Sequence, residues 1–288
     1  MTSSRQLLFR NGTLASGPWS LEMTPDAAQW DWTSLRIADI AAGDSLTFDT
    51  AGEEMLVLSL SGSVEVTSGS DRATIMGRAN VFSGVSDFVY VPPGRRVVLT
   101  SVKGGRFAVP GARSDSTRSF AYQPKEAIEV EYRGAGRCSR RVVNMCTDQT
   151  FDADRIIVCE VVTPGGNWSS YPPHKHDEDG PDESQLEEIY YFEVDGAGHG
   201  DAMAYQRIYG TLDRPIDLLA DVRDRDLVLV PHGWHGPTMA VPGYDAYFFN
   251  VMAGPGVRAW RICDDPAHSW IRDTWANEEL DPRVFTMN

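Results

Sequence analysis

The chain has 288 residues, of which 42% are hydrophobic and 23% charged, as in soluble globular proteins. Its formal net charge of −15 disfavours nucleic acid and anionic membrane surfaces as partners, because both would repel it. No apolar run approaches the roughly 20 residues needed to cross a bilayer, and the start lacks the apolar region of a signal peptide. The four cysteines form no CxxC pair and are expected to be reduced core residues. We therefore expect a cytoplasmic protein, and the sequence leaves its oligomeric state open, a homo-oligomer included.

Strand patterns dominate both halves of the chain. Short segments rich in β-branched and aromatic residues are bounded by Gly, Asp or Pro turns, which is typical of a sandwich or barrel. In the first half, the predicted strands are Leu35–Ile40, Ser45–Phe48, Met55–Leu60, Ser63–Thr67, Asn80–Phe82, Phe88–Val91 and Arg96–Val102. In the second half, they are Ile156–Thr163, Glu188–Val194, Met203–Tyr209, Asp226–Val230, Thr238–Val241 and Ala246–Val251. One helix is predicted over Pro266–Trp275, with Asp265 as its cap.

The two halves resemble each other. Glu53–Leu58 matches Glu187–Phe192 in form, so that Glu54 aligns with Glu188. Val89–Gly94 likewise matches Val228–Gly233. Two matches in the same order indicate a duplicated barrel. We predict domains over residues 1–115 and 116–288, joined through the Ser-, Gly- and charge-rich segment 111–141. Because all six histidines lie in the second half, the first barrel is expected to be metal-free.

Histidines and one acid mark a metal site in the second half. His174 and His176 alternate along an extended segment, so both imidazoles point to one face. Glu188 begins a later strand, and His235 follows the turn after Val230. Imidazole and carboxylate together suit Zn, Fe, Mn or Ni.

Each of the later ligands has a competitor nearby. Glu187 would point to the opposite face from Glu188, so only one of the two can join the site. His232 competes with His235 for the third histidine position, and His235 is preferred because the Gly-Trp turn returns the chain toward the barrel.

Three side chains are candidates for binding substrate. Gln206 and Arg207 lie on opposite faces of one predicted strand, and one of these faces lines the barrel. Arg207 or Lys175 can bind a carboxylate, and arginine is favoured because it makes two parallel bonds. A solvated charge on a β surface is an equally good interpretation of either residue.

With these residues assembled, the chain resembles a bicupin, and within the bicupins it resembles the 5-deoxyglucuronate isomerases of myo-inositol breakdown. The resemblance is carried by segments 161–177, 186–192, 206–209, 242–245, 250–255 and 81–92. It implies two tandem cupin-type β-barrels with a short C-terminal helix. It also implies that His174, His176, Glu188 and His235 hold one divalent metal ion.

The implied reaction is an aldose–ketose isomerisation of 5-deoxy-D-glucuronate to 5-dehydro-2-deoxy-D-gluconate. It requires removal of a weakly acidic proton beside an aldehyde, which a Lewis acid and a positioned base promote. Tyr191, Glu160 and Asp179 are the candidate bases, and a metal-bound hydroxide or a hydride shift is an alternative.

Two other functions are compatible with the same scaffold. One is a different metal enzyme, either an isomerase of pectin-derived 4-deoxy-5-keto-uronates or an Fe(II) dioxygenase. The other is a non-catalytic sugar-binding or regulatory cupin, which the absence of a helix-turn-helix pattern and the acidity of the chain disfavour.

Overall fold

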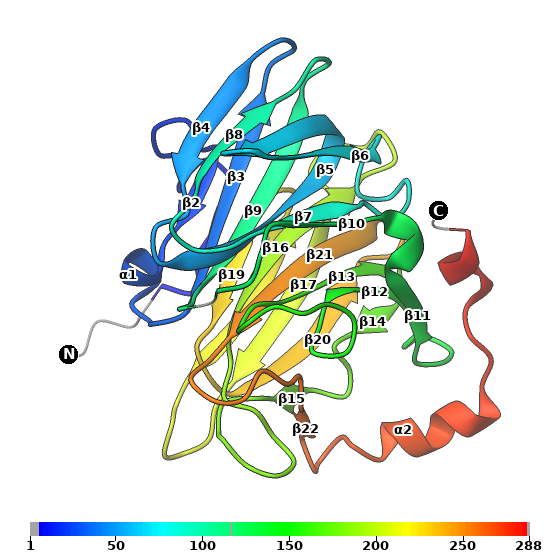
Figure 1. Cartoon of the computed structure of the whole chain (residues 1–288). Helices are drawn as coiled ribbons and strands as arrows, with labels where there is room; N and C mark the ends of the chain where they lie inside the picture. The colour runs from blue at the N-terminus through cyan, green and yellow to red at the C-terminus, as the bar shows by residue number, and fades with distance from the viewer. Residues whose placement is uncertain (1–5, 116, 287–288) are drawn as a thin grey trace.

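A computed structural model describes residues 6–115 and 117–286, and most of the regular structure in them is β-strand (Figure 1). The predicted all-β fold with a short C-terminal helix is confirmed. The helical elements are α1 (Pro25–Ala28), η1 (Lys125–Ala127), α2 (Ile271–Thr274), η2 (Trp275–Asn277) and η3 (Pro282–Phe285).

The first half of the chain forms one strongly curled sheet. Its strands are β2 (Leu21–Met23), β3 (Thr33–Ile40), β4 (Ser45–Asp49), β5 (Glu53–Ser68), β6 (Asp71–Arg78), β7 (Phe88–Val91), β8 (Arg96–Thr100), β9 (Gly105–Arg113) and β10 (Ala121–Gln123). The long strand β5 pairs with β6, β7, β8 and β9 along its length, which bends the sheet around a core of its own.

The second half forms two sheets that enclose another core. The first contains β1 (Leu8–Phe9), β11 (Glu129–Arg133), β12 (Arg140–Cys146), β13 (Ile157–Thr163), β16 (Glu187–Asp195), β19 (Leu227–Val230) and β21 (Asp245–Ala253). The second contains β14 (Trp168–Ser169), β15 (His174–Lys175), β17 (Met203–Tyr209), β18 (Asp217–Arg223), β20 (Trp234–Ala240) and β22 (Cys263–Asp264). The space between them holds Tyr190, Phe192, Ile208 and Phe248.

A third core lies between the two halves, where their large sheets pack face to face. Leu58 and Tyr90 from the first half join Ile189 and Phe249 from the second half in this core. Strands β5 and β16 are therefore buried on both faces. This explains why their sequences are continuous hydrophobic runs rather than alternating patterns.

Each half also contributes one strand to the sheet of the other. Strand β1 pairs with β19 of the second half, and β10 pairs with β7 of the first half. Because β7 and β19 are the matching strands of the repeat, the exchange has the reciprocity expected of a duplicated unit. The division of the chain at residues 115 and 116 remains a prediction, and Ser116 lies outside the described residues.

Two glutamates make a second reciprocal contact between the halves. The Glu54 carboxylate accepts hydrogen bonds from the backbone N–H groups of residues 154, 155 and 156, at 2.6–2.9 Å. The Glu187 carboxylate accepts hydrogen bonds from the N–H groups of residues 31, 32 and 33, at 2.8–3.2 Å. Glu54 therefore corresponds to Glu187, and the predicted match of Glu54 with Glu188 is wrong by one residue. Met55 pairs with Val91, and Glu188 pairs with Val230, which is the residue that matches Val91 in the repeat. Met55 is therefore the first-half residue that corresponds to Glu188.

The segment 111–141 is not the irregular connection that its composition predicted. It contains the end of β9, all of β10, η1 and β11, and the start of β12. Strand β10 extends the sheet of the first half, and β11 extends a sheet of the second half. The segment is therefore part of both halves.

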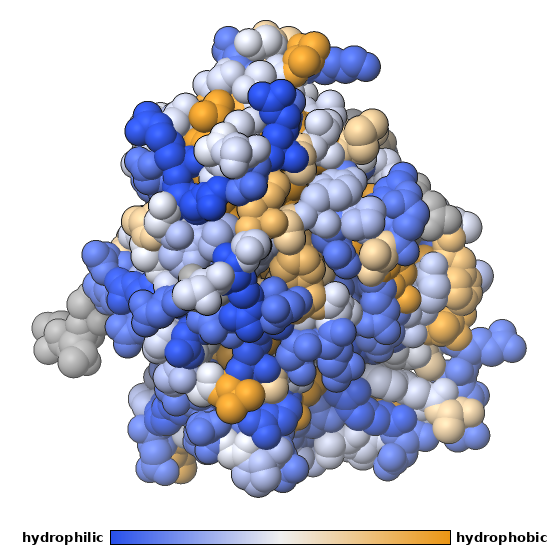
Figure 2. Space-filling model, in the orientation of Figure 1, coloured by the Kyte–Doolittle hydropathy of each residue, from blue (hydrophilic) through white to orange (hydrophobic). Residues whose placement is uncertain are grey.

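The surface seen in Figure 2 is mostly hydrophilic, and its hydrophobic side chains form small areas between polar ones. Large exposed hydrophobic residues such as Val102, Leu212 and Val257 lie far apart in the sequence. Among the described residues, no helix has both the length and the apolar character needed to cross a membrane.

Candidate metal centre and adjoining cavity

Three histidines from three segments converge inside the second half of the chain. His174 in β15 is paired directly with His235 in β20, and His176 follows β15 by one residue. One ring nitrogen from each of the three lies within 4.8 Å of the others, and all three side chains are buried. His174, His176 and His235 therefore converge on one point, as the sequence predicted.

Backbone carbonyls orient the three rings. The Nδ1 atoms of His176 and His235 lie 3.3 Å and 3.2 Å from the carbonyl oxygens of Leu186 and Gly233. His174 Nδ1 lies 3.5 Å from the carbonyl oxygen of Pro172. A carbonyl beside Nδ1 favours the tautomer that carries its proton there, which leaves the Nε2 lone pair available to a cation.

Glu188 supplies an oxygen to the same point. Its Oε2 lies 3.1 Å from His176 Nε2 and 3.1 Å from His235 Nε2. Burial opposes ionisation of this carboxyl, but His235 and His176 outweigh it and lower its pKa to about 2. Burial, with His235 and His176 nearby, also lowers the pKa of His174 well below its usual value. His176 Nε2 and His235 Nε2 approach the same carboxylate oxygen, and His235 Nε2 is buried without a hydrogen-bond partner among the described residues. A cation at this point would satisfy that nitrogen and the carboxylate together. The donor set therefore fits a divalent metal ion.

The structure separates the two competing positions in the turn after β19. His235 lies in the cluster, whereas His232 is not among the described side chains that meet there. Glu187 extends to the first half of the chain, as described above, while Glu188 points inward. The strand alternation expected for Glu187 and Glu188 is thus observed.

A cavity of about 170 Å³ opens beside the cluster. Its wall includes His174, Glu188 and Tyr190, and it is otherwise rich in arginine and aromatic side chains. The remaining lining residues are Arg133, Arg140, Val142, Val161, Ser170, Phe248, Asn250, Trp260, Ile262 and Arg272. The chain thus places a candidate metal centre at the wall of a cavity that also carries several positive charges.

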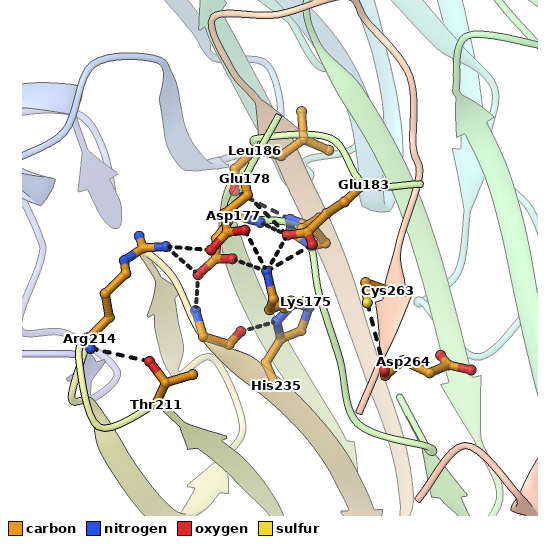
Figure 3. A network of polar contacts seen from close by, with 12 residues as sticks. Lys175, Asp177, Glu178, Glu183, Leu186, Thr211, Arg214, His235, Cys263 and Asp264 are labelled. Atoms are coloured by element: carbon orange, nitrogen blue, oxygen red, sulfur yellow. Dashed lines mark hydrogen bonds and ion pairs between the residues drawn. The ribbon is translucent and has the colours of Figure 1, made fainter. Parts of the chain in front are cut away.

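Lys175 points away from this cavity, into the network drawn in Figure 3. Its Nζ lies 2.9 Å from Asp177 Oδ1 and 2.8 Å from Glu183 Oε2. Glu183 also accepts hydrogen bonds from the backbone N–H groups of residues 177 and 178, at 2.7 Å and 3.0 Å. Asp177 in turn accepts a hydrogen bond of 2.8 Å from Gly233 N–H. Lys175 therefore anchors the loops that carry the histidines, and its predicted contact with substrate is not supported by this placement.

The other two substrate-binding candidates lie on opposite faces of β17, as expected. Gln206 is buried inside the barrel and accepts a hydrogen bond from Thr238 Oγ1, but it is not among the residues that line the cavity. Arg207 lies on the outer face, where it pairs with Asp217 and stacks on Tyr209. Arg207 therefore does not face the cluster.

The three candidate bases all lie away from the cavity. The Tyr191 hydroxyl donates to Glu193, and Glu160 pairs with Arg78 between the two halves. Asp179 is an exposed loop residue whose carboxylate lies next to Gly256. Because β16 alternates, Glu188 and Tyr190 face the cavity while Tyr191 faces the first half of the chain. From these positions Tyr191 and Glu160 cannot contact a substrate held at the cluster.

Sequence reasoning did not single out Tyr190 or Arg140 as cavity residues. The position of Tyr190 follows from that of Glu188, since residues two apart share a strand face. No comparable sequence signal marks Arg140, because it lies in the segment interpreted as a connection.

Comparisons with known proteins agree with this architecture. The model of the KduI/IolB family matches residues 7–271. The chain belongs to the KduI/IolB family. The family resemblance inferred from the sequence is thus confirmed.

Two relatives named 5-deoxy-glucuronate isomerase show how much of the chain is shared. The protein from Geobacillus kaustophilus is 39% identical over 257 residues, covering 88% of this chain and 91% of that protein. The protein from Bacillus subtilis strain 168 is 37% identical over 253 residues, covering 87% and 91%.

Two solved structures show the same fold. An IolB-like protein from Salmonella typhimurium superposes with a TM-score of 0.85 at 31% identity, covering 92% of this chain and 99% of that one. An oxalate decarboxylase from Bacillus subtilis superposes with a TM-score of 0.64 at 10% identity, covering 92% and 80%. The second likeness concerns the fold alone, and it agrees with the predicted bicupin architecture.

Proposed function

We propose that this member of the KduI/IolB family is an aldose–ketose isomerase that converts 5-deoxy-D-glucuronate to 5-dehydro-2-deoxy-D-gluconate in myo-inositol catabolism. The observation that carries the proposal is the convergence of His174, His176, His235 and Glu188 at the wall of a cavity that three arginines also line. The names of relatives that share most of the chain support the same reaction.

The four side chains would hold one divalent metal ion, and Zn, Mn, Fe and Ni all accept this ligand set. Such an ion would supply Lewis acidity toward a carbonyl oxygen and the neighbouring hydroxyl. The chain's own contribution begins with exclusion of water, because the cluster is buried. The three Nδ1 contacts and the Lys175 network then keep the rings in place.

Tyr190 is the cavity residue best placed to assist with a proton. Its hydroxyl lies 3.5 Å from Ser170 Oγ, and burial, together with the Glu188 carboxylate, raises its pKa well above the usual value. Tyr190 therefore keeps its proton at neutral pH and donates a hydrogen bond to a substrate oxygen on which negative charge develops.

The decisive experiment combines metal analysis with an NMR assay of 5-deoxy-D-glucuronate. The wild type should contain one divalent ion per chain and consume the aldehyde signal without taking up oxygen. Run in D₂O, the assay also separates the two proton routes, since an enediol intermediate exchanges with solvent and a hydride shift does not. Turnover of 4-deoxy-5-keto-uronate alone would replace the proposed substrate.

We expect His176→Ala to abolish metal binding and turnover, because the remaining ligands cannot close the site. His232→Ala is the matched control and should retain both. Circular dichroism should show the same β content in the two variants. Full activity of the folded His176→Ala variant would refute the proposed metal centre.

A further inference from the structure

Arg140 is a buried arginine that forms no ion pair with any acidic residue that the structure describes. It is 5% exposed and lines the same cavity as His174 and Glu188. Its Nη1 donates one hydrogen bond of 2.9 Å to the carbonyl oxygen of Cys138, and the guanidinium lies 5.6 Å from the ring centre of Trp275. Among residues 6–115 and 117–286, no carboxylate lies within ion-pair distance of it.

The other two arginines of the cavity differ in this respect. Arg133 pairs with Glu131 at 2.6 Å, and Arg272 pairs with Asp264. Both also contact tryptophan rings, so their charge and orientation are satisfied within the chain. Among the described residues, Arg140 is the member of this set that forms no ion pair, and Glu131, the partner of Arg133, acts on it only from beyond that distance.

A buried cation without an ion-pair partner is costly, and this cost points to a ligand. Burial, reinforced by the neighbouring Arg133, lowers the pKa of Arg140 to about 9. A guanidinium has five N–H donors in a planar fork, and within the described part of the chain one of them, on Nη1, has a hydrogen-bond acceptor, the Cys138 carbonyl oxygen. A carboxylate matches that fork with two parallel hydrogen bonds and would restore the balance of charge.

We propose that Arg140 binds the carboxylate of the substrate and thereby selects a uronate over the corresponding neutral sugar. The identity of the uronate depends on the proposed function, but the preference for an acid does not. A substrate with a carboxylate at one end and an aldehyde at the other would then be held at both ends, by Arg140 and by the cluster.

The test compares 5-deoxy-D-glucuronate with 5-deoxy-D-glucose, in which an alcohol replaces the carboxylate. We expect Arg140→Gln in the metal-loaded protein to lower kcat/KM for the acid by about 100-fold, the range for a hydrogen-bonded charge pair. For the alcohol, the change should be less than about threefold. For Arg140→Lys, kcat/KM for the acid should lie between the values of the wild type and Arg140→Gln, because lysine keeps the positive charge but lacks the planar fork of donors.

The matched control is Arg141→Gln. Arg141 is the next residue of β12 and is also buried, but it points toward the first half of the chain, near Glu160 and Arg78. Its substitution should leave the ratio of the two kcat/KM values unchanged. An equal loss for acid and alcohol in Arg140→Gln would show a purely structural role and overturn the proposal.

A binding measurement separates this proposal from the proposed function. Calorimetric titration of the metal-loaded protein with D-glucuronate and with D-glucose requires no turnover. We expect the wild type to bind the acid at least tenfold more tightly, and Arg140→Gln or Arg140→Lys to reduce that preference. If the preference persists in both variants, or is absent from the wild type, the proposal is wrong. If 5-deoxy-D-glucuronate is not isomerised but the preference depends on Arg140, only the proposed function fails.

Discussion

At the scale of single residues, neighbouring side chains of one strand have separate environments. Tyr190 and Tyr191 are adjacent in β16, and both are almost completely buried. Tyr190 faces the cavity and Tyr191 faces the first half of the chain, where Arg106 and Glu193 surround its hydroxyl. Burial raises the pKa of both hydroxyls well above the usual value. Only the direction of the side chain distinguishes a residue that can meet substrate from one that cannot.

We therefore expect Tyr190→Phe to lower kcat/KM by about tenfold or more, since it removes a hydrogen bond that strengthens in the transition state. Tyr191→Phe removes the same atom from the opposite face and should change kcat/KM by less than about twofold. Steady-state kinetics on both variants, with metal content measured in parallel, compares the two positions. A larger loss in Tyr191→Phe would show that the assignment of faces is wrong.

At the scale of elements, the cluster depends on tight contact between β20 and the segment before β15. Gly236 follows His235 and has a φ of +92°, and a Cβ atom placed there would lie 1.8 Å from the carbonyl oxygen of Ser170. Gly243 has the same φ of +92°, but a Cβ atom placed on it would meet no other atom within 4 Å. The two glycines thus share the same φ and differ in the space around them.

Substituting both glycines separates backbone strain from close packing. Gly243→Ala should cost about 1–2 kcal/mol of stability, the usual penalty for an L residue in this region. Gly236→Ala should cost more and should also weaken metal binding, because the displaced backbone carries His235. Urea unfolding and metal titration measure the two effects. Equal losses in the two variants would mean that the contact with Ser170 has no influence on the site.

Elements also differ in how well local patterns predict them. Strands β7 and β17 have the predicted bounds, whereas the segments predicted at 55–60 and 63–67 are one strand, β5. The predicted strand at 80–82 is a turn. The strands that were not predicted are β1, β2, β6, β9, β10, β11, β12, β14, β18 and β22. The C-terminal helix begins at Ile271 rather than Pro266, after a turn in which Asp265 accepts a hydrogen bond of 2.8 Å from Ala267 N–H. Pairing with distant strands, rather than local preference, decides these segments.

At the scale of the whole molecule, a buried ion pair joins the two halves. Arg78 and Glu160 are both at most 2% exposed as side chains, and the Tyr247 hydroxyl donates to Glu160 at 2.7 Å. Arg141 lies in the same interface, so Glu160 compensates more than one positive charge. Together with the exchanged strands and the Glu54 and Glu187 contacts, this pair holds the two halves against each other.

Glu160→Gln should therefore destabilise the protein by about 3 kcal/mol, because it leaves buried guanidinium groups without a counter-charge. Its kcat should change by less than about threefold, whereas loss of a general base would lower kcat by roughly 100-fold or more. Urea unfolding gives the stability and the NMR assay gives kcat. The double variant Arg78→Met, Glu160→Met should recover part of the lost stability. A large fall in kcat for stable Glu160→Gln would restore Glu160 as a catalytic candidate.

Residue patterns along the chain were sufficient to predict the fold class, the family and the convergence of His174, His176, Glu188 and His235. These depend on short-range alternation along strands and on a motif whose order matches the barrel. The same patterns did not predict which charged side chains face the cavity, and this became clear from the folded arrangement. Lys175, Arg207 and Glu160 find partners on their own side of a sheet, while Arg140 is left without one. The physical reason is that a charge is compensated by whatever lies near it in space, and those neighbours are set by strand pairing between distant segments.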